Sequence, residues 1–147
     1  MQRKRSSREL LEEYAALEYI LLGDLRDLLE EPPDEVTRQW LRAVLDALLQ
    51  TLPCQFNLKE QGGYLREVVD EYPTWSNLVD QLRREHAALF ERLQELRARL
   101  DHDGSFQDIA DGLRIQLRDW LRSVIAFHRH EKRLVQTAMN LEVGVGD

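Results

Sequence analysis

The fold is decided by the stretch Trp75–Leu100, WSNLVDQLRREHAALFERLQELRARL. Its apolar side chains recur at alternating steps of four and three residues, the spacing of one face of an α-helix that packs against other helices. One polar residue, His86, interrupts this face. We therefore expect one long helix here, buried along one side. The apolar residues of its seam are Trp75, Val79, Leu82, Leu89, Leu93, Leu96 and Leu100.

A second long helix is predicted after the turn Asp101–Gly104. It opens at Ser105, with Asp108 in the position of a capping box. Its seam is again apolar, except at Glu131. A carboxylate on a buried face is costly unless it is paired, hydrogen-bonded or bound to a metal ion. The apolar members of this seam are Phe106, Ala110, Leu113, Leu117, Trp120, Val124, Phe127, Leu134, Ala138 and Leu141.

The N-terminal half of the chain predicts two more helical segments. The first begins at Ser6, which Glu9 follows in capping-box spacing, and ends at Pro32-Pro33 because proline keeps the preceding residue out of helical angles. The second begins near Asp34. We expect the inner face of the first to hold Leu10, Tyr14, Leu17, Leu21, Leu25 and Leu28, and that of the second Val36, Trp40, Val44 and Leu48.

Two features of the second segment leave its course open. Pro53 either kinks the helix or breaks it, since a proline inside a helix removes a hydrogen bond. Helical periodicity resumes from Phe56 and lasts to Pro73, with Gly62-Gly63 in the middle. A glycine pair there predicts close backbone packing or a local irregularity.

Long amphipathic helices joined by short connections predict an all-α fold, an up-down antiparallel four-helix bundle. We expect a single domain over residues 9–147, preceded by a flexible basic tail over residues 1–8. With 147 residues, 7 glycines and 4 prolines, the chain is poor in the turns that a β-sandwich needs.

The charge and cysteine content exclude several classes of function. The net charge of −7 argues against nucleic acid as a partner, and no apolar stretch is long enough for a membrane helix. Cys54 is the only cysteine, so no internal disulfide can form and a cytoplasmic location is expected. No catalytic motif is present, and we predict that the chain is not an enzyme.

Three stretches resemble signatures of the hemerythrin-like, or HHE cation-binding, family. They are Phe56–Tyr64 (FNLKEQGGY), Arg84-Glu85-His86, and Glu131–Leu134 running into Gly144–Asp147. The resemblance implies an up-down four-helix bundle whose interior holds a pair of iron ions. Members of the family carry or sense dioxygen, or handle iron and oxidants.

At the majority of the ligand positions, the chain departs from this family pattern. It has 4 histidines in all, and the first-helix histidine falls at Leu25. The second-helix pair is either Gln55 with Lys59 or Phe56 with Glu60, and the fourth-helix pair is Phe127 with Glu131. The candidate metal ligands are therefore His86, Glu131 and Glu60.

These observations predict a hemerythrin-like bundle that has lost most of its di-iron ligands and serves as a non-enzymatic structural or regulatory interaction module, with no cofactor. Its partner would be an unidentified protein or a second copy of the chain. The alternative is a metal-binding sensor that holds iron or zinc through His86, Glu60 and Glu131, with His128 as a further ligand. A third hypothesis is a regulator that uses the exposed acidic face and the basic tail.

Overall fold

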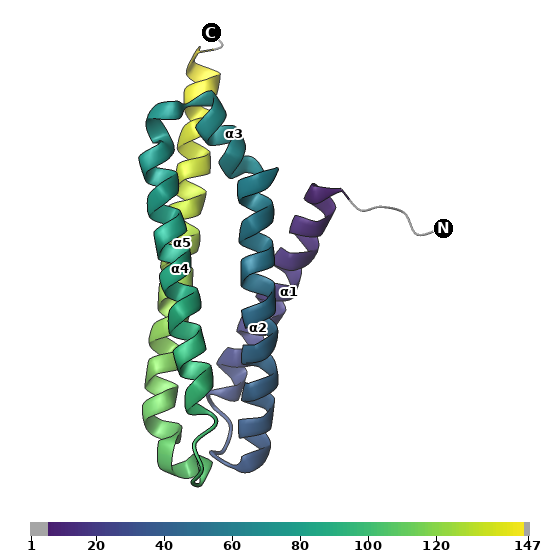
Figure 1. The fold of residues 1–147 in the computed structure, drawn as a ribbon, viewed down its shortest axis with the longest axis vertical. Helices are drawn as coiled ribbons and strands as arrows, with labels where there is room; N and C mark the ends of the chain where they lie inside the picture. The colour runs from purple at the N-terminus through teal and green to yellow at the C-terminus, as the bar shows by residue number, and fades with distance from the viewer. Residues whose placement is uncertain (1–5, 146–147) are drawn as a thin grey trace, which may run out of the picture.

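The computed structural model describes residues 6–145, and the side chains of residues 6–138 and 140. The regular secondary structure of this part of the chain is all helical. Its elements are α1 (Ser7–Leu28), α2 (Glu35–Gln61), α3 (Tyr64–Glu71), a short 3-10 helix η1 (Pro73–Trp75), α4 (Ser76–Arg99) and α5 (Phe106–Val145). Four helices are long, and in Figure 1 α2, α4 and α5 run alongside one another as a bundle. None of the described helices has the length and apolar character needed to cross a membrane.

The first two helices begin at the predicted caps. The Ser6 side chain accepts a hydrogen bond from the backbone N–H of Glu9 at 3.1 Å, and Asp34 accepts one from that of Thr37 at 2.9 Å. Each satisfies an N–H that the first helical turn leaves without a partner. Since α1 starts at Ser7, it takes in the last two residues of the expected tail. Residues 1–5 of that tail lie outside the described residues.

The second segment breaks at the glycine pair and not at the proline. α2 continues through Pro53 to Gln61, and α3 starts only after Gly63. A Cβ atom at Gly63 would lie 2.9 Å from the Cα of Lys59 and 3.0 Å from the carbonyl oxygen of Leu58. The chain therefore folds back over the end of α2 more closely than a side chain at this position would allow.

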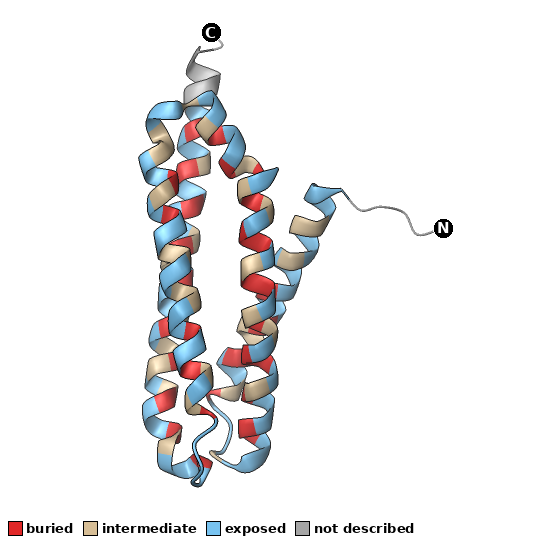
Figure 2. Cartoon of the chain, viewed as in Figure 1, coloured by how far each residue is buried: buried red, intermediate tan, exposed pale blue. Residues whose placement is uncertain are grey.

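The core consists of two clusters, one near each end of the bundle. Figure 2 shows buried residues along the sides on which the helices face one another. The apolar residues of the two predicted seams are buried, except that Trp75 and Leu89 are partly buried and Leu141 falls outside the described side chains. The larger cluster includes Leu25, Leu45, Leu48, Leu93, Leu96 and Leu117; the smaller includes Phe56, Leu65, Val79, Leu82, Phe127 and Leu134.

The inner faces predicted for α1 and α2 were partly wrong. Leu17 is 42% exposed, and Val36 and Trp40 are 61% and 60% exposed. Figure 1 shows the reason for α1: its N-terminal half diverges from the bundle, so one side of it has no neighbour. Glu18 is buried in place of Leu17. In α2 the buried stripe is Leu41, Val44, Leu45, Leu48 and Leu52.

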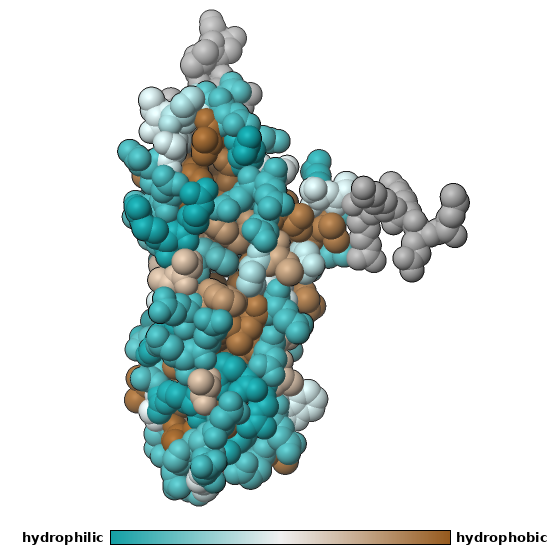
Figure 3. All heavy atoms as spheres, in the orientation of Figure 1, coloured by the Kyte–Doolittle hydropathy of each residue, from teal (hydrophilic) through white to brown (hydrophobic). Residues whose placement is uncertain are grey.

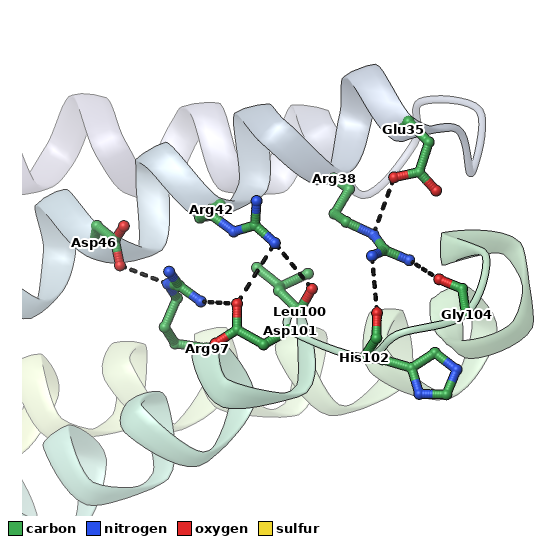
Figure 4. Close-up of polar contacts among 9 residues, drawn as sticks. All are labelled: Glu35, Arg38, Arg42, Asp46, Arg97, Leu100, Asp101, His102 and Gly104. Carbon is green, nitrogen blue, oxygen red and sulfur yellow. Dashed lines mark hydrogen bonds and ion pairs between the residues drawn. The ribbon is translucent and has the colours of Figure 1, made fainter.

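Arginine side chains of α2 form hydrogen bonds to the end of α4 and to the turn that leads into α5 (Figure 4). Arg38, only 8% exposed, donates to the carbonyl oxygens of His102 at 3.0 Å and Gly104 at 2.6 Å. Arg42 donates to the Leu100 carbonyl oxygen at 3.1 Å. These bonds satisfy carbonyl groups that the end of α4 and the turn leave without helical partners.

Candidate functional site

A cluster of polar side chains lies where α1, α2, α3 and α5 approach one another, on the side where α1 diverges. We call it the interior polar cluster. Polar groups in a helical core are costly unless they pair, so their arrangement indicates what this part of the bundle can do. Its members are Glu18 of α1, Gln55 and Lys59 of α2, Tyr64 of α3, and His128 and Glu131 of α5.

The centre of the cluster is an ion pair between Lys59 and Glu131. The Lys59 ammonium donates to both carboxylate oxygens of Glu131, each at 3.0 Å. The two side chains are only 7% and 11% exposed. Both oxygens of the carboxylate therefore accept hydrogen bonds from a cation that belongs to the protein itself.

Tyr64 adds a further hydrogen bond to Glu131 from the first turn of α3. Burial, together with the Glu131 charge and this hydrogen bond, raises the pKa of the Tyr64 hydroxyl well above its usual value. The phenol therefore stays protonated and acts as a donor. It helps to satisfy a carboxylate that has little contact with water.

A second pair joins α1 to α5. The Glu18 side chain is 4% exposed, and one of its oxygens lies 2.9 Å from Nε2 of His128. This contact links α1 to α5 at the point where α1 begins to diverge from the bundle. It gives one of the two oxygens of the buried Glu18 carboxylate a hydrogen-bond partner.

His86 packs as an aromatic ring. It stacks on Phe56 with ring centres 4.2 Å apart and lies 5.7 Å from the ring centre of Phe127. Burial lowers the pKa of His86, and a hydrogen bond with the backbone of Leu52 opposes this shift. The imidazole is therefore held in its neutral form among apolar neighbours.

The structure does not bring the three candidate ligands to one centre. Glu131 pairs with Lys59, His86 stacks on Phe56, and Glu60 accepts a hydrogen bond from Arg83 at 2.5 Å on a more exposed side of the bundle. Among the residues that the structure describes, no group of three or more His, Cys, Asp and Glu side chains is arranged to hold a metal ion.

The residues present do not fit a pair of iron ions. An iron ligand must offer a free lone pair, and of about four on the Glu131 carboxylate, two accept from Lys59 and one from Tyr64. A cation placed here would also meet the ammonium at close range, in an interior where charge repulsion is weakly screened. The chemistry of the cluster is therefore hydrogen bonding and charge pairing.

Sequence reasoning missed Glu18 and passed over Lys59, although a signal existed for each. Glu18 stands seven residues after Leu11 and seven before Leu25, which places it on the same helical face. Lys59 belonged to one of the two registers left open for the second helix, Gln55 with Lys59. Both members of that register are buried, at 5% and 6% exposure.

The chain was compared with models of protein families, with curated proteins and with solved structures, and no match was found in any of the three.

Proposed function

We propose that this chain is a hemerythrin-like, up-down antiparallel four-helix bundle that has lost most of its di-iron ligands and acts as a non-enzymatic structural or regulatory interaction module. The observation that carries the proposal is the Lys59–Glu131 pair. Glu131 is a candidate ligand position in the family resemblance, and the ammonium of Lys59 takes the place of a bound cation. An internal cation neutralises the buried carboxylate at any metal concentration.

Two apolar side chains at expected ligand positions also support the loss of the di-iron site. Leu25 and Phe127 stand where the resemblance implies histidines, and they are 0% and 4% exposed. Large apolar groups fill the space that ions and their ligands would need, as close packing favours.

The interaction role is supported by apolar side chains on the surface of α1. Tyr19 and Ile20 are 82% and 57% exposed on a helix that packs mainly on α2. In Figure 3 hydrophobic atoms reach the surface where α1 leaves the bundle, on a face that is otherwise mostly hydrophilic. Exposed apolar residues of this kind suit a protein partner or a second copy of the chain. We place the module in a reducing cytoplasm, where the unpaired thiol of Cys54 is stable.

Metal content tests the proposal. The full chain is expressed in medium supplemented with iron and zinc and purified without chelator or histidine tag. We expect far less than one metal ion per chain, and a melting temperature that neither ferrous iron, zinc nor a chelator changes. Near-stoichiometric metal that is lost in Glu131→Ala or His86→Ala would overturn the proposal and indicate the metal-binding sensor.

The surface of α1 is tested separately. Tyr19→Ser and Ile20→Ser remove exposed side chains, so helicity and melting temperature should stay unchanged while association with the partner, or with a second copy, weakens. Association equal to that of the parent chain would remove this surface from the proposal.

A further inference from the structure

The divergence of α1 opens a groove of about 490 Å³ beside the interior polar cluster. Its walls are apolar and include Leu11, Ala15 and Leu22 of α1. At its rim Arg8 and Glu12 form an exposed ion pair at 3.5 Å. The interior polar cluster forms its floor. Its volume falls within the range of pockets that bind small organic ligands.

Gln55 is the first indication of a ligand. Its side chain lines the groove and is 95% buried, since the residue is only 5% exposed. Among the described residues its amide has no hydrogen-bond partner. Neither amide atom of Gln55 is among the fully enclosed, unpartnered side-chain atoms of the described residues, so the amide reaches the groove, where its oxygen can accept a hydrogen bond from a ligand.

Glu18 is the second indication. One of its oxygens contacts His128, and the other has no hydrogen bond within the described part of the chain. The charges around the groove are otherwise matched: Arg8 with Glu12 and Lys59 with Glu131. The imidazole of His128 carries a charge only when protonated. Glu18 has a histidine as its partner and no lysine or arginine, and its carboxylate is the negative group of the groove without such a cation.

We propose that the groove binds a small primary amine with an apolar tail. The ammonium group donates to the free oxygen of Glu18 and to the amide oxygen of Gln55. The tail lies along Leu11, Ala15 and Leu22. An ammonium supplies up to three donors and one positive charge, which suits two acceptors and a carboxylate that has no lysine or arginine partner. A carboxylate or phosphate ligand would be repelled by Glu18. Tyr19 lines this groove as well as the exposed surface of α1, but the inference does not depend on the proposed function.

Titration of the isotope-labelled full chain with hexylamine, followed by two-dimensional NMR, tests the site. We expect saturable shifts of the Gln55 side-chain amide and of the backbone amides of Leu11 and Ala15. Hexanol and hexanoate, which share the tail without the cation, should bind much more weakly. Shifts that do not saturate, or equal binding of the three probes, would overturn the proposal.

Three variants locate the site. Glu18→Gln keeps the size of the side chain and removes its charge, so hexylamine should bind about tenfold more weakly or worse. Glu12→Gln removes a charge at the rim only and should leave the affinity unchanged. Ala15→Phe fills the groove from an exposed position and should abolish binding while circular dichroism stays that of the parent. Unchanged affinity in Glu18→Gln, or in Ala15→Phe should Glu18→Gln fail to fold, would refute the assignment.

Discussion

Replacing Lys59 by methionine should destabilise the protein more than any exposed charge change. The variant keeps an unbranched side chain of similar length but leaves the Glu131 carboxylate without its ammonium partner. Breaking a buried ion pair by removing one partner costs about 3–5 kcal/mol. Tyr64 still donates to Glu131, so we expect the lower end of this range. For a chain of 147 residues a loss of about 3 kcal/mol corresponds to a fall in melting temperature of about 6–12 °C.

The assay is urea unfolding followed by circular dichroism, with the free energy of unfolding taken from the midpoint at constant slope. Arg66→Met is the matched control, because Arg66 and Asp70 form a pair whose side chains are both 64% exposed. It should cost less than about 1 kcal/mol. The double variant Lys59→Met/Glu131→Met should recover most of the loss, since an apolar pair leaves no buried charge. A Lys59→Met loss as small as that of the control, or no recovery in the double variant, would refute the reasoning.

Three further predictions concern other parts of the fold. Burial lowers the pKa of His86, so the unfolded chain takes up a proton that the folded chain does not, and stability falls as the pH drops below the ordinary pKa of 6.5. In urea unfolding at about pH 7.5 and about pH 5, His86→Phe should lessen this fall in stability. An identical fall in the variant and the parent chain would contradict the prediction. Arg38→Met leaves two carbonyl groups of the α4–α5 turn unsatisfied and should lower the free energy of unfolding by about 2–3 kcal/mol. A loss no larger than that of Arg66→Met would show that the turn does not depend on the Arg38 hydrogen bonds. Gly63→Ala should lower the melting temperature because its Cβ would meet the backbone of α2. Gly62→Ala should change the melting temperature much less, since the nearest atom to its Cβ would be 3.8 Å away. Equal effects of the two variants in thermal unfolding would argue against the close approach at Gly63.

The seams of α4 and α5 were predictable from sequence because both helices are covered along their whole described length. A helix with neighbours on one side throughout keeps a regular apolar stripe, and periodicity is enough to find it. α1 is different. Its stripe changes at Leu17 and Glu18 because the helix departs from the bundle, and that departure depends on packing between distant segments. Trp40 was misplaced because steps of four residues from Val36 lead through Trp40 to Val44 and Leu48, and only the last two belong to the buried stripe of α2.

Only part of the candidate site was predictable from the sequence. Glu131 and His86 were found because each interrupts an apolar seam. Their surroundings were not, since Glu131 meets Lys59 from 72 positions earlier in the chain and His86 meets Phe56 from another helix. Lysine is rarely buried, so a lysine at the edge of a stripe is normally assigned to solvent. Lys59 is held inside by Glu131 of α5 and by Tyr64 of α3, whose ring centre lies 6.0 Å from its ammonium.

The Lys59–Glu131 pair has a consequence for how this chain can diverge. If loss of either member alone is costly, evolution cannot easily pass through a sequence that has one without the other. Related chains should then carry the two charges together, exchange their signs together, or replace both with apolar residues. The two positions would therefore covary, and the covariation in an alignment of natural homologues would report the energetic coupling between α2 and α5.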